Sequence, residues 1–313
     1  MPAWREETFE HRRTHEAADV AKLAVLTRVD RSTIFFDGFT ASGYVRDGTV
    51  RNIQFRVVKE PLNLQCRGKA VSRDGARIAY VLVADDAKRC EIVVRDLSTG
   101  RDTTLVYVAK SYRMLAWSWG DTEIAYEGPA GIMAVSTADG QERIVARRPF
   151  RINGTPIPSG YFLESVDWRH DNSQLVVDAN ICVPTGEPDA CQHENHTLIV
   201  SPSGDSRLLA VGKSPSVSPT ADLVALASRS HVEVINADGS NRRRLTRIPA
   251  LFDLALFREW VGPTMLWSPG GDRLLFGTVI DEESNGNYYL VEIESGRRQR
   301  VLTNTSIDVT AWR

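Results

Sequence analysis

The sequence predicts an all-β fold, a six-bladed β-propeller built from four-stranded antiparallel blades. A short segment with one apolar residue at its centre returns six times along the 313 residues. The intervals between these anchors are 46, 51, 49, 50 and 45 positions, and the anchors are Val71, Trp117, Trp168, Val217, Trp267 and Trp312. A period of about 40 to 50 residues with one such anchor per unit is typical of propeller blades.

Each repeat predicts four short strands joined by tight turns. In the fifth repeat, the clearest one, the strands are expected at residues 264–268, 273–278, 287–293 and 297–302. Earlier repeats follow the same order, with second strands at 77–81, 123–126, 174–177 and 223–227. Glycine and aspartate recur between the strands because glycine adopts positive φ and aspartate bonds the backbone of its own turn. We therefore expect each repeat to be an antiparallel meander.

The sixth repeat is divided between the two ends of the chain. Residues 307–313 are expected to form its innermost strand, and residues 32–36, 41–45 and 49–58 are expected to supply the other three. One C-terminal strand pairing with three N-terminal strands would leave no open sheet edge. The prediction is therefore one propeller domain over residues 32–313.

Residues 1–31 form an extension outside the repeats. Their stretch from 16 to 26 has the composition of a short helix, with three apolar residues spaced to share one face. Two interpretations stay open: a helix that packs on the propeller rim, or an arm that binds a partner.

The charge balance argues against nucleic acid as a partner. The chain has 38 basic and 40 acidic residues, a net charge of −2, so no overall field attracts a polyanion or an anionic membrane. The longest apolar run, residues 78–84, is too short to span a bilayer. The first residues lack the pattern of a secretory signal, which indicates an intracellular protein or one whose signal has been removed. We expect a monomer that needs no cofactor.

Four cysteines leave the redox compartment open. Cys182 and Cys191 flank a turn-rich segment that is able to close as a disulfide, and Cys66 and Cys90 are the other pair available. Buried reduced cysteines are equally ordinary in a core, so both states remain open.

Two stretches carry a resemblance to a known family. Residues 235–246, INADGSNRRRLT, and residues 266–276, LWSPGGDRLLF, resemble the repeats of TolB-type six-bladed β-propellers, and the resemblance covers about residues 65–313. It implies the propeller fold and favours a location outside the cytoplasm. It leaves function open, because similar propellers occur in periplasmic TolB proteins, as lids on prolyl-oligopeptidase-like enzymes and in some polysaccharide lyases.

One face of the predicted propeller collects the long insertions. They are expected in the connections between blades and between second and third strands, at residues 150–161, 180–196, 248–262 and 280–287. We call this side the loop-rich face, and the side of the short hairpins the tight-turn face. Variable loops on a rigid scaffold are the usual place for binding. Trp260 lies in an apolar insertion that is either a plug at the rim or a surface for a hydrophobic ligand or partner.

A set of ionisable residues is expected around the central channel. Counting four residues back from each anchor places a residue where the innermost strand enters from the loop-rich face, and five of these six residues are ionisable: Arg67, Arg113, Glu164, Lys213 and Asp308, with Pro263 as the sixth. They form either a ring of ion pairs that satisfy one another or a binding site for a polar ligand.

His193 and His196 have the spacing of a metal-binding pair. No third protein ligand lies near in sequence, so exposed loop histidines are the expected outcome and no metal is predicted.

Two functions follow from this pattern. The first is a non-catalytic binding module that presents the loop-rich face to a protein or peptide. The alternative is a lyase or hydrolase that acts on a polar or carbohydrate-like substrate, for which the catalytic candidates are Arg113, Glu164, His193 and His196. Nucleophile-elbow, phosphate-loop and dinucleotide motifs are not found, so catalysis would have to use channel residues.

Overall fold

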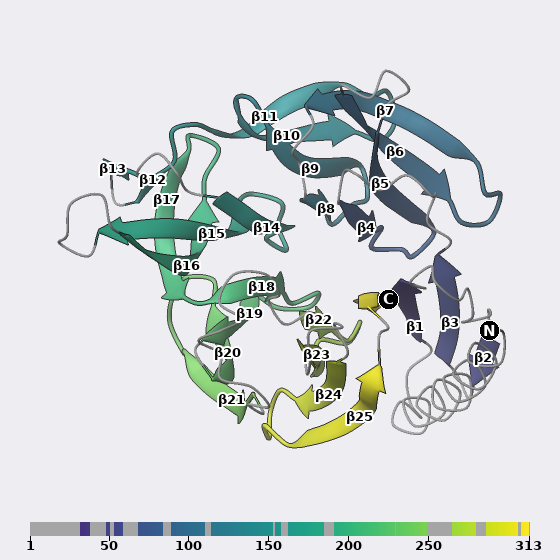
Figure 1. The fold of residues 1–313 in the computed structure, drawn as a ribbon, viewed down its shortest axis with the longest axis vertical. Coiled ribbons are helices and arrows are strands. Elements are labelled where there is room, and N and C mark those ends of the chain that lie inside the picture. Colours follow the sequence, from purple (N-terminus) through teal and green to yellow (C-terminus); the bar gives the residue numbers. More distant parts are fainter. Residues whose placement is uncertain are drawn as a thin grey trace, which may run out of the picture. The chain divides into compact units, whose positions relative to one another are not determined.

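The computed structural model describes two compact units, one formed by Met1–Glu60 with Ile248–Arg313 and one by Pro61–Arg247. The described residues are 32–37, 48–50, 53–58, 68–83, 89–109, 114–152, 154–157, 162–184, 191–228, 230–248, 265–279, 286–305 and 308–312. All regular elements in these ranges are β-strands (Figure 1). The predicted N-terminal helix lies outside them.

The unit Pro61–Arg247 contains the predicted meanders of repeats one to four, which we call sheets one to four. Sheet one is β4 (Lys69–Val71), β5 (Arg77–Val83), β6 (Arg89–Asp96) and β7 (Asp102–Ala109). Sheet two is β8 (Leu115–Trp117), β9 (Glu123–Gly128), β10 (Gly131–Ser136) and β11 (Glu142–Arg147). Sheet four is β18 (Lys213–Val217), β19 (Leu223–Ser228), β20 (His231–Asn236) and β21 (Arg243–Arg247). In each sheet the strands follow the chain order and pair antiparallel, as predicted.

Sheet three is wider than predicted. Its meander is β14 (Phe162–Trp168), β15 (Leu175–Pro184), β16 (Cys191–Val200) and β17 (Asp205–Val211), and a hairpin of β12 (Arg151–Ile152) and β13 (Thr155–Pro156) extends it. The hairpin was expected on the loop-rich face. Instead, β12 pairs in parallel with the first residues of β17, at the outer edge of the sheet. Phe150 and Ile157, 1% and 6% exposed, hold the hairpin against the core.

The second predicted insertion, residues 180–196, is also ordered differently. We expected a loop, but β15 and β16 continue as paired strands from Leu175↔Val200 to Pro184↔Cys191. The insertion therefore lengthens a hairpin, and its side chains alternate between two faces.

The unit built from both chain ends contains two sheets. One is β22 (Met265–Trp267), β23 (Arg273–Val279), β24 (Gly286–Glu292) and β25 (Arg298–Thr305), an antiparallel meander as predicted. The other has the order β2-β3-β1-β26, from β1 (Ser32–Asp37), β2 (Gly48–Val50), β3 (Ile53–Val58) and β26 (Asp308–Trp312). The C-terminal strand thus pairs antiparallel with an N-terminal one.

This divided sheet is not the simple meander that we predicted. β1 and β3 pair in parallel, because the stretch expected as one strand, residues 49–58, folds back on itself as the hairpin of β2 and β3. The expected middle strand, residues 41–45, lies outside the described part of the chain.

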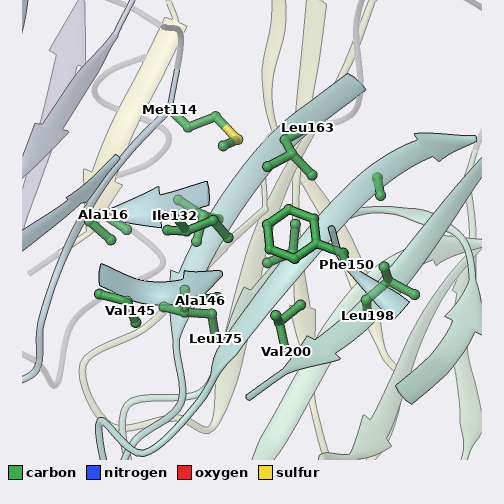
Figure 2. Packing of buried hydrophobic residues seen from close by; sticks show 14 of the residues in the cluster. Met114, Ala116, Ile132, Val145, Ala146, Phe150, Leu163, Leu175, Leu198 and Val200 are labelled. Atoms are coloured by element: carbon green, nitrogen blue, oxygen red, sulfur yellow. The ribbon is translucent and has the colours of Figure 1, made fainter. Parts of the chain in front are cut away.

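The tryptophan anchors explain why the repeat exists. Trp117 and Trp168 are 2% and 1% exposed, and each indole N–H donates to a main-chain oxygen one sheet earlier. The acceptors are Ala70 at 2.9 Å and Ala116 at 3.1 Å. Burial of the ring contributes hydrophobic free energy, and the indole N–H fixes the spacing between sheets. Figure 2 shows the apolar cluster between sheets two and three, in which Phe150 lies beside Leu163 and Leu198.

Candidate functional site

A buried carboxylate lies in the middle of sheet three. Asp178 interrupts the apolar run of β15 and is 2% exposed. Its Oδ1 accepts a hydrogen bond from Asn195 Nδ2 at 3.0 Å, and its Oδ2 accepts the main-chain N–H of Ser214 at 2.8 Å. Because Ser214 belongs to β18, the carboxylate joins sheets three and four. Each oxygen retains capacity for a further donor.

The two innermost strands are irregular at the same level. The pairing of β14 with β15 shifts register between Leu163 and Ser165, and that of β18 with β19 shifts between Lys213 and Ser216. Ser214 adopts a φ of 54°, a left-handed conformation that costs a non-glycine residue energy. Bulges of this kind redirect side chains, often beside functional sites.

The irregular strands bring Glu164 and Lys213 into the electrostatic neighbourhood of Asp178. Glu164 is exposed and Lys213 half-buried. Ser165, directly opposite Asp178 in the ladder, has a buried hydroxyl that makes no hydrogen bond. An unsatisfied buried hydroxyl is unusual and marks a place where a water or ligand group would bind. We call Glu164, Ser165, Asp178, Lys213 and Ser214 the Asp178 cluster.

Burial dominates the electrostatics of this cluster. Desolvation raises the pKa of Asp178 to about 6, and the hydrogen bonds from Ser214 and Asn195 and the charge of Lys213 only partly oppose it. The negative charge of Glu164 raises this pKa further. Burial also lowers the pKa of Lys213, while the two carboxylates act in the opposite direction. The cluster therefore holds a carboxyl group that exchanges its proton near neutral pH.

The structure brings together two of the predicted channel residues, Glu164 and Lys213. Arg67, Arg113 and Trp260 lie outside the described residues. Asp308 belongs to β26 in the other unit, where its side chain is not described.

The sequence interpretation missed Asp178, Asn195 and Ser214. A signal for Asp178 was present, since it is an ionisable residue at an inward position of a strand otherwise rich in valine, leucine and isoleucine. Such a residue is seldom buried without a specific partner.

The two histidines of the predicted metal pair lie on one strand, β16. Residues three apart on a strand point to opposite faces, which argues against a shared ion. His193 Nδ1 lies 2.7 Å from Asn180 Oδ1, whereas His196 Nε2 lies 3.2 Å from Glu194 Oε2. Across the described ranges, no three histidine, cysteine or acidic side chains are grouped as metal ligands would be.

A second polar cluster lies on the tight-turn face of the same unit. The Arg73 guanidinium pairs with Asp167 at 2.5 Å, donates to the main-chain oxygen of Trp117 and lies 3.9 Å from the centroid of the Trp119 ring. Asp167 also accepts the N–H of Val217 at 3.0 Å. These contacts link the inner strands of all four sheets. Since every group has a partner, we assign this cluster to stability.

Two cysteines have described side chains, Cys90 and Cys182, and both are disulfide-bonded. The pairings Cys66 with Cys90 and Cys182 with Cys191 stay predictions.

Comparison with solved structures identifies the fold. TolB from Acinetobacter baumannii superposes with a TM-score of 0.51 at 15% sequence identity, over 78% of this chain and 56% of that one. The fold is a TolB-like β-propeller. An oligogalacturonate lyase in complex with manganese matches the propeller with a TM-score of 0.50 at 18% identity, over 74% of this chain and 64% of the lyase. A nidogen/laminin complex matches at 0.51 and 10% identity, over 79% and 83%.

These similarities concern architecture. The TolB-like propeller spans less than two thirds of the TolB and lyase chains that it matches. No family model and no curated protein matches its sequence. Within the described residues, no helix has the length and apolar character needed to cross a membrane.

Proposed function

We propose that this propeller is a non-catalytic binding module whose loop-rich face takes a protein or peptide partner. The observation that carries the proposal is the Asp178 cluster, where an exposed Glu164 and a half-buried Lys213 lie beside a buried carboxylate. Both residues lie near the start of an innermost strand, where connections between blades reach the sheets. Two bulges and one left-handed serine maintain this arrangement at a cost in stability, which is more typical of functional sites than of structural ones.

The unpaired hydroxyl of Ser165 supports ligand binding at the same place. A polar group that reaches this buried hydroxyl would pair with it, as buried polar groups ordinarily are paired. Arg67 and Arg113 remain proposed members of this surface, and Trp260 and Asp308 remain proposed binding residues of the other unit. The nidogen/laminin complex is a propeller of similar fold in a structure of two proteins, so the scaffold suits such a role. A location outside the cytoplasm is part of the proposal, and the disulfide-bonded cysteines favour it.

The test uses the full chain as bait for extracts of its source cells, followed by calorimetry with the purified captured protein. Glu164→Lys and Lys213→Gln should each weaken binding about tenfold or more, because the first reverses a charge at the contact and the second removes one. Asp74→Ala and Asp238→Ala, in turns of the tight-turn face, are the matched controls and should bind as wild type. Equal loss of affinity in both sets, or loss only in the controls, would show that the loop-rich face is not the binding face.

A second candidate is a lyase or hydrolase, favoured by one observation. Asp178 and Lys213 have pKa values shifted toward neutrality by burial, as acid–base catalysts often do. The enzyme hypothesis adds Asp178 to Arg113, Glu164, His193 and His196. An oligogalacturonate lyase shares the fold.

Polygalacturonate is therefore the first substrate to try, with and without added manganese, by following unsaturated products and reducing ends. If the enzyme hypothesis holds, Asp178→Asn should abolish turnover. Product formation that persists in this variant would exclude Asp178 from the chemistry.

A further inference from the structure

The outer strand of sheet four carries an unusual density of arginines. β21 contains Arg243, Arg244 and Arg247, and Arg242 precedes it directly. Among the other outer strands, β7 has no arginine, β17 has one, and β11 and β25 have two each. Among the described strands, only β20 pairs with β21, so no described strand covers its other edge.

A buried carboxylate orients two of these arginines. The Glu233 side chain on β20 is 4% exposed and pairs with Arg242 Nη2 at 2.6 Å and with Arg244 Nε at 3.4 Å. The two arginine side chains are 43% and 71% exposed. One carboxylate therefore holds two guanidinium groups, and the group as a whole keeps one positive charge. Arg242 Nη2 also donates to Ser228 Oγ at 3.3 Å. The remaining N–H donors of the two exposed guanidinium groups suit a carboxylate.

The other face of the strand is positive as well. Arg243 points away from Arg244 because side chains alternate along a strand. It is exposed and has no ion pair with a carboxylate in the described ranges. A chain that lies along this edge would therefore meet positive charge above and below its backbone.

The protein itself shows that the outer edge of such a sheet accepts a further strand. In sheet three, β12 pairs with β17 through Arg151↔Asp205 and Ile152↔Ser206. The N–H of Arg151 donates to the Gly204 carbonyl at 3.2 Å, and Ser206 Oγ donates to the Arg151 carbonyl at 2.8 Å. The neighbouring sheet has the equivalent edge at β21, and no described strand pairs with it.

We propose that β21 binds an extended acidic segment of a partner protein by strand addition. Main-chain hydrogen bonds along this edge supply affinity. Acidic side chains at successive positions of the added strand point to opposite faces and pair with the arginines on each face. The site is separate from the Asp178 cluster and does not depend on its proposed role.

The probe is a fluorescein-labelled peptide, Val-Glu-Glu-Glu-Glu-Val, whose successive glutamates point to both faces of an extended strand. Its binding to the full chain is measured by fluorescence anisotropy at physiological salt. Saturable binding is expected, and replacing glutamate by lysine should abolish it. Arg243→Glu should weaken binding about tenfold, because it turns an attractive cross-strand pair into a repulsive one. This exposed arginine pairs with no carboxylate of the described residues, so the fold should tolerate the change. Arg300→Glu, on the outer strand β25, is the matched control and should bind as wild type.

Two further peptides and one competitor separate strand addition from general charge attraction. A central proline in the acidic peptide removes a ladder hydrogen bond and should weaken binding about tenfold. Equal binding of the proline peptide, or of Arg243→Glu and wild type, would overturn the proposal. Equal loss in Arg300→Glu would also overturn it. A third result would overturn it: single-stranded DNA binds wild type as tightly as the acidic peptide does, and Arg243→Glu weakens the binding of DNA as well. That result would indicate a surface that binds polyanions in general.

Discussion

The indole N–H of Trp168 donates a hydrogen bond to the main-chain oxygen of Ala116 at 3.1 Å, across the boundary between sheets three and two. Trp117 makes the equivalent bond to Ala70, one sheet earlier. The anchors of the sequence repeat are thus defined by a bond between successive sheets as well as by burial. Both tryptophans contact the clusters that fill the space between sheets.

Replacing Trp168 should therefore cost more than its apolar area suggests. Trp168→Phe removes the hydrogen bond to the Ala116 carbonyl and part of the buried ring, and it should destabilise by about 2 kcal/mol. Trp168→Ala adds a cavity and should cost about 3 to 5 kcal/mol. Urea unfolding followed by circular dichroism measures both. Tyr107→Ala, at a side chain that is 55% exposed, is the control and should change stability by less than about 0.5 kcal/mol. If Trp168→Phe unfolds with the wild type, the bond contributes nothing.

Asp178 makes a prediction about pH. Burial raises its pKa in the folded state to about 6, whereas an unfolded chain has an ordinary value near 3.8. The folded state therefore binds the proton of Asp178 more tightly than the unfolded state does. Proton binding stabilises the fold fully below about pH 4, and this stabilisation is lost as pH rises through 6. Asp178→Asn removes the dependence. Between pH 4 and 7, its free energy of unfolding should gain about 3 kcal/mol relative to wild type, from two pKa units. Denaturant titrations at several pH values measure this difference, and parallel profiles would contradict it.

The sequence repeat made the fold predictable. The local structure of the inserted segments could not be predicted from it. The turn at Gly75 has a φ of 70°, as expected for a tight hairpin, because the residue type and its place in the repeat agree. The equivalent turn of the second repeat uses Asp121, with a φ of 54°, although a glycine stands one position earlier. Asp121 accepts the N–H groups of Arg73 and Asp74 from the previous sheet. This long-range contact has no signature in the local sequence.

The candidate site was predictable in part for the same reason. Counting positions within the repeat identified Glu164 and Lys213, because equivalent residues occupy equivalent places. Asp178 was missed because the count followed only the innermost strands, and Ser214 because a left-handed serine depends on the bulge around it. The setting of the two histidines was predicted incorrectly, because residues 180–196 were interpreted as a loop and the structure has His193 and His196 on the strand β16.

Asp167 should contribute strongly to stability, because two partially buried groups depend on its carboxylate. Asp167→Ala leaves the Arg73 guanidinium, whose side chain is 14% exposed, without its carboxylate, and it leaves the Val217 N–H without an acceptor. The expected loss is about 3 to 5 kcal/mol in the free energy of unfolding. Asp238→Ala, in an exposed turn, is the control and should cost less than about 1 kcal/mol. A loss of similar size in the two variants would show that Arg73 finds another partner or enough water.

The cysteines allow a chemical test. We expect Cys182 to be bonded to Cys191 when the protein matures outside the cytoplasm, because β15 and β16 bring the two chain segments together at Pro184↔Cys191. By the loop-entropy model, a ring of about ten residues contributes about 2 to 3 kcal/mol. Peptide mapping under non-reducing conditions should recover the two cysteines in one linked fragment. Free thiols at both positions, in protein recovered from its native compartment, would refute the pairing.

The last prediction concerns the C-terminal strand. β26 pairs with β1 through Ile34↔Trp312 and Phe36↔Val309, so deleting residues 307–313 leaves the edge of β1 open. Trp267, at the equivalent place in the preceding repeat, is 4% exposed, and we expect Trp312 to be buried in the same way. Loss of such a side chain alone costs about 3 to 5 kcal/mol, so the truncated protein should melt at a clearly lower temperature and aggregate through the open edge. Trp312→Ala keeps the strand and separates the two effects. A truncated protein that melts with the full chain would show that β26 does not hold the N-terminal strands in place.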